Sequence, residues 1–229
     1  MQEKAPDLGR RAAEANAKFL AALAVMVFLA AGTLAYWQGW LFLATFAAWS
    51  AGTSVYFYHR DPALLEKRMR AGPSAESEPL QKRIQLFTSV VMIALVILSA
   101  LDYRFGWSAV PVWAIVLGNL LISAGFLFVF FVLKENSFAS ATIEVAPDQH
   151  VVSTGPYALV RHPMYAAVLP LASGIPLALS SLWGLIVVPL IFLGLILRLI
   201  DEERHLRRDL PGYEDYCRKV RYRLFAGLW

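Results

Sequence analysis

The chain alternates long apolar runs with short polar connections, a pattern typical of a helical membrane protein. Four runs are each long enough, or nearly so, to cross a hydrocarbon core about 30 Å thick as a helix: Phe19–Tyr36, Trp40–Tyr58, Ile84–Leu101 and Val110–Leu133. A fifth run, from Met164 to Ile200, is longer than one crossing needs and has glycine, proline and serine near its middle. We expect it to form two shorter helices joined by a tight turn. The pattern predicts an all-α integral membrane protein with about six transmembrane helices.

The basic residues give this arrangement an orientation, because Lys and Arg accumulate in short loops on the cytoplasmic side of a membrane. With a cytoplasmic N-terminus, six crossings place 20 of the 21 Lys and Arg residues in cytoplasmic segments and only Arg104 outside. Five or seven crossings would break this pattern. We therefore expect both termini to be cytoplasmic.

Composition excludes several classes of protein. Hydrophobic residues make up 58% of the chain and the mean hydropathy is +0.53, too apolar for an ordinary soluble domain. The net charge of +4 is explained by basic loops that face anionic lipid, so we expect no nucleic-acid partner. Cys217 is the single cysteine, so no intramolecular disulfide can form and its thiol is interpreted as incidental. The polar N-terminal stretch lacks a small-residue cleavage site, which favours a retained anchor over a signal peptide.

The polar connections divide the chain into an N-terminal four-helix membrane region, residues 1–133, and a C-terminal region, residues 134–229, that carries the candidate chemistry. The connection His59–Arg83 includes AGPSAESEP, a turn-rich and weakly ordered loop, and is predicted to be a connector. The next connection alternates apolar and polar residues around Thr142–Val145, which predicts an extended or interfacial segment. No Gly-rich nucleotide-binding motif and no nucleophile-elbow motif occurs, so any small molecule must be held by the membrane helices and their cytoplasmic ends.

The polar tail, from Asp201 to Trp229, should begin as a continuation of the last membrane helix. We expect that helix to reach Leu210, because Pro211 and Gly212 follow. A second amphipathic helix, from Tyr213 to about Arg223, should then lie on the membrane surface with Tyr216 and Val220 on one face.

The stretch GPYALVRHPMY, residues 155–165, opens the fifth predicted membrane helix. His162 takes the cap position and the proline after it begins the helix. A helix start with free N–H groups beside Arg161, His162, Tyr157 and Tyr165 could form a polar pocket at the membrane rim. The alternative is structural, with a snorkelling arginine and ordinary interfacial tyrosines.

The end of the sixth predicted helix, ILRLIDEERHL, supplies a second group of polar side chains. Arg198 and Glu202 are four residues apart and can meet on one helix face, whereas Glu203 is offset from Arg198 by about 140°. Ionised groups at a bilayer boundary are functional candidates, although a snorkelling arginine and a solvated acidic turn are the structural alternative. Glu202 and His205 have the spacing of a di-metal site, but the further carboxylates that such a site needs are missing, so we expect no metal.

Taken together, these stretches resemble the isoprenylcysteine carboxyl methyltransferase family in its bacterial branch, which is related to the phospholipid methyltransferases. The resemblance rests on segments that occur in order: ENSF, GPYALVRHPMY, PLALSSLWG, DEERHL and LPGYEDYCRKVRYRL. It covers roughly residues 134–224. The specific feature is R-H-P-x-Y followed some forty residues later by E-E, and either half alone would be weak.

The resemblance implies an integral membrane methyltransferase that uses S-adenosylmethionine, held in a pocket built from these segments and the tail. Carried over by position, the residues that bind or shape the cofactor pocket are Gly155, Tyr157, Arg161, His162, Tyr165, Glu202, Glu203, Tyr213 and Tyr216. Arg198 and Glu203 are similar to the Arg and Glu beside the reacting group, which makes them the catalytic candidates. Ala167 and Ala226 depart from the pattern, where relatives often have Gly and Pro.

The expected reaction is methyl transfer to a lipophilic substrate that enters sideways from the bilayer of a bacterial inner membrane. Carboxyl O-methylation is favoured, with Arg198 orienting the carboxylate. N- or S-methylation of a phospholipid amine or a lipophilic thiol is the alternative, and it would require a base such as Glu203 or His162. A non-catalytic transporter or assembly factor is the alternative of another class; a transporter would place charge deep inside several helices. The sequence fixes neither the substrate nor the oligomeric state.

Overall fold

The computed structural model describes residues 7–76, 78–142 and 149–229, and these residues form helices and loops. The long helices are α1 (Leu8–Ala31), α2 (Trp37–Arg60), α4 (Pro79–Phe105), α5 (Val112–Glu135), α6 (Pro163–Ala178) and α7 (Val188–Asp209). The short elements are α3 (Pro62–Met69), α8 (Tyr213–Lys219) and the 3-10 helices η1 (Gly155–Ala158) and η2 (Trp183–Val187). The predicted all-α fold class is confirmed.

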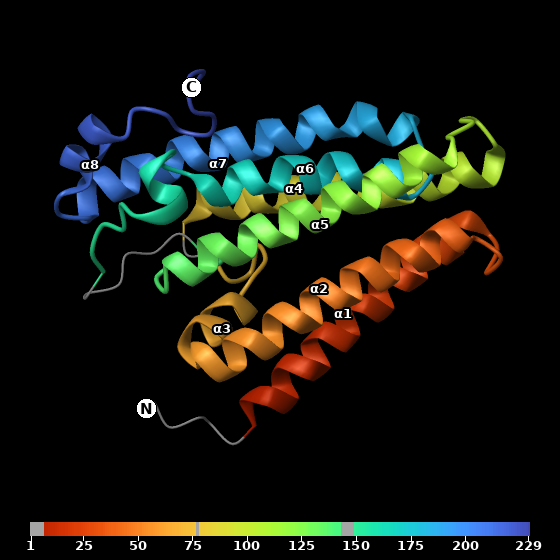
Figure 1. The fold of residues 1–229 in the computed structure, drawn as a ribbon, viewed down its shortest axis with the longest axis horizontal. Coiled ribbons are helices and arrows are strands. Elements are labelled where there is room, and N and C mark those ends of the chain that lie inside the picture. Colours follow the sequence, from red (N-terminus) through yellow and green to blue (C-terminus); the bar gives the residue numbers. More distant parts are fainter. Residues whose placement is uncertain (1–6, 77, 143–148) are drawn as a thin grey trace.

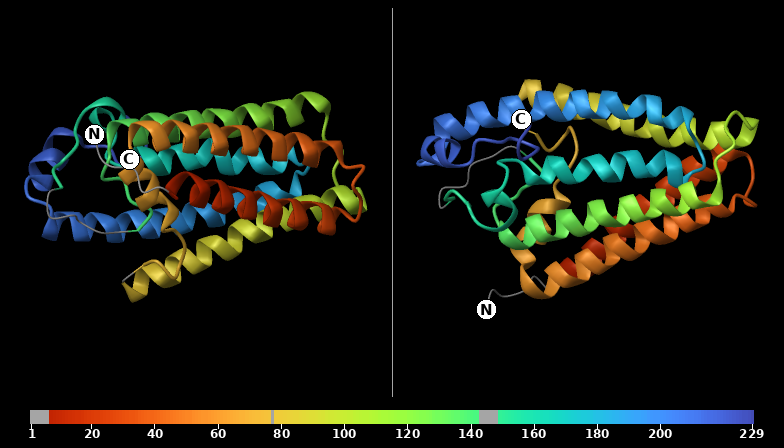
Figure 2. Two further views of the ribbon diagram at one scale, coloured as in Figure 1. Left: turned by 90° about the horizontal axis from the view of Figure 1, so that it is seen from below. Right: turned by 45° about the horizontal axis from the view of Figure 1, so that its top comes forward.

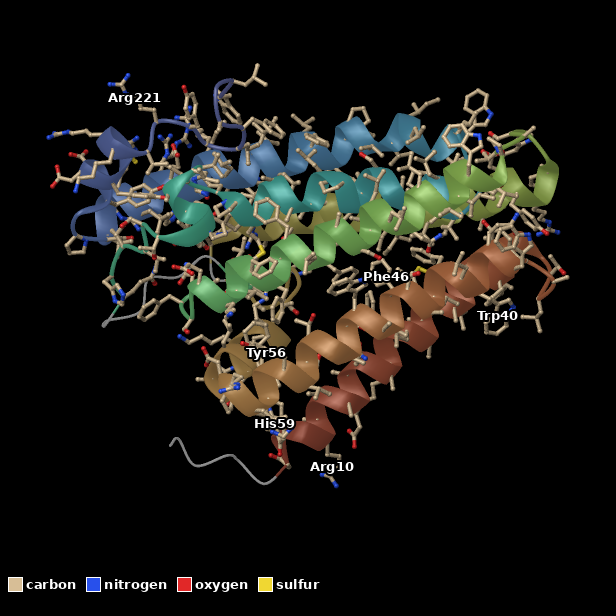
Figure 3. All side chains as sticks on the ribbon, in the orientation of Figure 1. Arg10, Trp40, Phe46, Tyr56, His59 and Arg221 are labelled. Atoms are coloured by element: carbon tan, nitrogen blue, oxygen red, sulfur yellow. The ribbon has the colours of Figure 1, made fainter. Side chains whose placement is uncertain are left out.

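The long helices follow one another in antiparallel pairs, α1–α2, α4–α5 and α6–α7, whose connecting turns all lie at one end of the molecule (Figures 1 and 2). The tail with α8, helix α3, the start of α1 and the C-terminus lie at the other end (Figure 1). In Figure 3, Trp40 marks the turn end of α2, and His59 marks its other end. Arg104 lies at the turn end, close to Gly32 in the α1–α2 turn. The chain therefore reverses where the sequence pattern places its reversals.

Length and composition make four helical segments long and apolar enough to cross a membrane: α1, α4, α5 and the continuous segment Trp183–Asp209. Helix α6 has only 16 residues. Helix α2 is long enough, but it is rich in Trp, Tyr, Gly and Ser, which lower its hydropathy. Large apolar side chains such as Leu29, Leu120 and Ile186 point outward, as expected of helices that face lipid. The crossing count of six and the side on which the termini lie stay predictions.

Helices α5 and α6 approach so closely that their backbones touch. A Cβ atom on Gly118 would lie 2.3 Å from the backbone nitrogen of Ala178, and one on Gly174 would lie 2.5 Å from the carbonyl oxygen of Gly118. No side chain fits at such distances, so both positions require glycine. Small residues of this kind are what allow helices to pack tightly in a membrane.

Helix α2 packs against α5 through aromatic rings. Figure 3 shows Phe46 and Tyr56 on the side of α2 that faces α5; the Phe46 ring meets Phe126 with centroids 4.9 Å apart, and the Tyr56 ring meets Phe130 at 4.8 Å. Both contacts are T-shaped, a favourable aromatic geometry. The α1–α2 hairpin thereby positions α3 at the end of the bundle where the tail lies.

Helix α3 lies within the predicted connector His59–Arg83, before its turn-rich stretch AGPSAESEP, and was not predicted. Asp61 caps it by accepting a hydrogen bond from the backbone N–H of Leu64 at 3.0 Å, and a proline occupies its first turn. Leu64 is buried against Leu133 of α5. The D-P start is a helix signal present in the sequence, but it is easily missed in a segment rich in turn-forming residues.

The tail follows the prediction as far as Pro211 and then departs from it. Helix α7 ends at Asp209, and Tyr216 and Val220 are both buried, as a shared face requires. Helix α8, however, ends at Lys219 and does not reach Arg223, because Val220 is extended. The expected extended segment at Thr142–Val145 falls largely on residues 143–145, outside the described residues.

Candidate active site

The start of α6 is fixed by pairing with the tail. The backbone N–H of Arg161 donates to the carbonyl oxygen of Tyr222 and that of His162 donates to the carbonyl oxygen of Arg223, each at 2.9 Å. His162 is the N-cap residue of α6 and Pro163 is its first residue, as predicted. The His162 ring is buried and stacks on the ring of Tyr165, with centroids 5.8 Å apart.

Glu202 of α7 faces these residues. The hydroxyl of Tyr165 donates to Oε2 of Glu202 at 2.6 Å, and Nδ1 of His162 lies 3.8 Å from the same oxygen. The structure thus brings together the opening of the fifth predicted membrane helix and the acidic pair at the end of the sixth. This juxtaposition is what a single site built from both motifs requires.

Glu203 is buried and points toward the tail. Its Oε1 accepts a hydrogen bond from Nε of Arg161 at 2.7 Å and lies 3.3 Å from Nε2 of His162. Its Oε2 accepts from Nε of Arg223 at 3.0 Å. Arg161 also donates to two backbone carbonyl groups of the tail. The carboxylate therefore joins the start of α6, the end of α7 and the tail.

Tyrosines of α8 and η1 lie beside these residues. The Tyr216 hydroxyl donates to the carbonyl oxygen of Tyr157 at 2.7 Å, and Tyr213 is buried beside it. The Tyr157 hydroxyl accepts a hydrogen bond from Nδ2 of Asn136 at 3.0 Å. Burial raises the pKa of Tyr157 to about 12, so its phenol is neutral at physiological pH.

A cavity of about 590 Å³ lies at this end of the bundle. Eight of the predicted site residues line it: Tyr157, Arg161, His162, Tyr165, Arg198, Glu202, Tyr213 and Tyr216. Its apolar wall includes Val129 of α5, Val168 of α6 and Leu195 of α7. The volume falls within the range of about 300–1,000 Å³ that is typical of small-molecule sites.

Gly155 and Glu203 differ from the prediction because neither lines this cavity. Gly155 has φ +54°, and a Cβ atom there would lie 2.8 Å from Cδ of Glu135. The Thr154 hydroxyl donates to the same carboxylate at 2.5 Å. Gly155 therefore shapes the turn that leads into η1, and Glu203 lies behind the cavity wall.

Arg198 lines the cavity, but its ion-pair partner is not Glu202, the residue that the helical spacing predicts. Its Nη1 forms an ion pair with Oε1 of Glu76 at 2.7 Å and donates to the side-chain oxygens of Gln81 and Gln85 at 3.2 and 3.1 Å. Its Nη2 donates to the carbonyl oxygen of Ala141 at 2.9 Å. These contacts hold the guanidinium toward α4. The neighbours of the Glu202 carboxylate are therefore Tyr165 and His162.

Arg68 of α3, which no sequence motif singles out, also lines the cavity. Its Nη1 donates to the carbonyl oxygen of Ser140 at 3.1 Å. Burial lowers the pKa of this guanidinium from its usual value. Within the part of the chain that the structure describes, no group of three or more His, Cys, Asp or Glu side chains is arranged to hold a metal ion.

Comparison with known protein families supports an enzymatic interpretation of this cavity. Residues 113–211 match the phospholipid methyltransferase family model. The match indicates a methyltransferase with membrane helices, and it agrees with the sequence resemblance at the level of the wider family. No curated protein matches the chain.

The phospholipid methyltransferase match covers α5, α6 and α7, and with them His162, Tyr165, Arg198 and Glu202. It leaves out α1 to α4, which include Arg68, and the tyrosines of α8. The cavity is therefore assembled from matched and unmatched parts of the chain.

Proposed function

We propose that the protein is a methyltransferase that uses S-adenosylmethionine and methylates a lipophilic acceptor within the membrane. The observation that carries the proposal is the cluster of Glu202, Tyr165 and His162, which lies on the cavity wall and within the residues that match the family model. Either finding alone would be weaker, because a polar cluster can be structural and a family match alone does not define a pocket.

The residues of the cavity fit S-adenosylmethionine, which supplies a methyl group bonded to a positively charged sulfur. The Glu202 carboxylate can accept hydrogen bonds from ribose hydroxyls. The faces of Tyr157 and Tyr165 can pack against a base and favour a nearby cation. Buried lining residues such as His162 and Tyr213 favour exclusion of water while the acceptor is held in line with the donor.

A carboxylate is the acceptor that we favour, because it is nucleophilic without losing a proton. An amine or thiol would require a base. The candidate base Glu203 accepts hydrogen bonds from Arg161 and Arg223, and the other candidate, His162, lies between Glu202 and Glu203. Both candidate bases therefore already have partners. The match to phospholipid methyltransferases favours the second candidate, N-methylation of a phospholipid amine, with His162, which lines the cavity, as the base.

Calorimetric titration of the purified protein with S-adenosylhomocysteine tests the proposal. The wild type should bind, and Glu202→Gln should weaken binding about tenfold or more, because a charged hydrogen-bond acceptor is lost. Glu214→Gln is the matched control, since Glu214 is an exposed glutamate of α8. A wild type that does not bind would refute the proposal, and full affinity in Glu202→Gln would place the cofactor elsewhere.

The acceptor atom can be read from the product. Protein incubated with methyl-labelled S-adenosylmethionine and a membrane lipid extract should give a labelled lipid. Release of the label as methanol under mild alkali identifies a methyl ester, whereas a label that resists alkali identifies an N- or S-methyl product and would overturn carboxyl methylation.

A further inference from the structure

The arginines of the cavity differ in their partners. Four arginines line it: Arg68, Arg161, Arg198 and Arg208. Three have a carboxylate partner, since Arg161 pairs with Glu203, Arg198 with Glu76 and Arg208 with Asp209. Among the described residues, no carboxylate lies within ion-pair distance of Arg68. Arg68 therefore brings a positive charge to the cavity that these residues do not neutralise.

The surroundings of Arg68 make an unmatched charge costly. Its side chain is half-buried, and Tyr157, Tyr165 and the cationic Arg198 are near enough to influence it electrostatically. The hydrogen bond to the Ser140 carbonyl uses one of its five N–H donors. An anion that entered the cavity would supply the missing charge and accept from the remaining donors in a two-pronged geometry.

The position of α3 relates this charge to the apolar part of the cavity. Leu64 and Leu65 of α3 belong to a hydrophobic cluster against which Val129 and Met164 pack, and these last two residues also line the cavity. A ligand with an anionic head and an apolar chain could therefore place its head at Arg68 and its chain along α5 and α6.

We propose that Arg68 recognises an anionic oxygen group, a carboxylate or a phosphate, on the lipophilic acceptor. The inference rests on the proposed function and gives the N-terminal half of the chain a role in acceptor selection. Arg68 lies outside residues 113–211, the part that matches the phospholipid methyltransferase family and contains Glu202, Tyr165 and His162, the cluster on which the proposed cofactor site rests. A residue outside that part suits recognition of the acceptor, which varies between enzymes.

The test uses full-length protein in phosphatidylcholine nanodiscs and three amphiphiles with the same chain: dodecanoate, dodecyl phosphate and dodecyltrimethylammonium. Binding is followed by intrinsic fluorescence at about pH 8.5, where both anions are ionised. At least one anion should bind the wild type more tightly than the cation does, and whichever anion binds better identifies the group as carboxylate or phosphate. Arg68→Gln should weaken that binding about tenfold or more, and Arg68→Lys should retain part of it.

Arg70→Gln is the matched control, because Arg70 is exposed at the end of the same helix and does not line the cavity. It should bind the anions as the wild type does. Equal affinity of the three probes, or equal affinity of Arg68→Gln and Arg70→Gln for the anions, would overturn the proposal. A normal melting temperature for Arg68→Gln, or retained binding in Arg68→Lys, separates loss of recognition from misfolding.

S-adenosylhomocysteine titration of the same variants separates this inference from the proposed function. Arg68→Gln should bind S-adenosylhomocysteine within about twofold of the wild type, because the charge acts on the acceptor. A loss of about tenfold or more there, with anion binding unchanged, would assign Arg68 to the cofactor and overturn the inference. A wild type that does not bind S-adenosylhomocysteine refutes the proposed function, while the dependence of anion binding on Arg68 is still measured independently.

Discussion

Replacing Glu203 with glutamine should destabilise the protein by detaching its tail. The carboxylate and Arg161 are both nearly inaccessible, with side-chain exposures of 6% and 5%. Breaking a buried ion pair by removing one charge typically costs about 3–5 kcal/mol. Glutamine keeps one acceptor oxygen, and Arg161 keeps its two backbone acceptors, so we expect a loss of about 2–3 kcal/mol.

The free energy of unfolding can be measured by titrating SDS into detergent micelles that contain the protein. Trypsin provides a local readout, because Arg221 projects at the surface of the tail (Figure 3) and its backbone should become cleavable once the tail leaves α6. Glu214→Gln makes the same chemical change at an exposed site and should stay within about 0.5 kcal/mol of the wild type. If Glu203→Gln behaved like this control and resisted trypsin equally, Glu203 would not hold the tail.

Three further predictions follow from the packing and the local chemistry. Gly174→Ala should lower the free energy of unfolding by about 1–3 kcal/mol in the same assay, because it forces α5 and α6 apart. Gly52→Ala is the control and should be neutral or stabilising, because a Cβ there would meet nothing within 4 Å. Equal effects of the two substitutions would contradict the close approach of α5 and α6. Gly155→Ala should cost about 1–2 kcal/mol, because φ is +54° there and Glu135 blocks the side chain, and wild-type stability would show that the turn tolerates a side chain. Burial raises the pKa of Cys217, so less of its thiol is ionised at neutral pH than that of glutathione. Maleimide should therefore label Cys217 more slowly than glutathione, and the labelling rate should increase at higher pH. Labelling as fast as that of glutathione would refute this prediction.

The elements that the sequence predicts correctly are those fixed by local chemistry. The His-Pro pair sets the first residue of α6, and Pro211 stops α7, because proline lacks an N–H and restricts the residue before it. The interruption near Gly174 and Pro176 correctly divides the long apolar run, although both residues lie within α6 and the break comes after Ala178. Local rules place such an end within a few residues.

The site contacts that the sequence does not predict are between segments distant in the chain. Arg198 and Glu202 do lie one helical turn apart, but the spacing of one helix carries no information about Glu76, which the α3–α4 connection brings to Arg198. Likewise, α8 stops before Arg223 because the tail pairs with the backbone of Arg161 and His162. Contacts of this kind depend on how hairpins pack, and a single sequence does not show that packing.

The glycine contact between α5 and α6 restricts which parts of the site can move. Two helices whose backbones touch cannot slide past each other by a turn without the Gly118 carbonyl colliding with a side chain. His162 and Tyr165 are thus held on a fixed support. We therefore expect entry and exit of molecules to depend on displacement of another boundary of the cavity, such as α3. A crosslink between α5 and α6 should leave turnover intact, whereas one between α3 and the 136–142 segment should stop it.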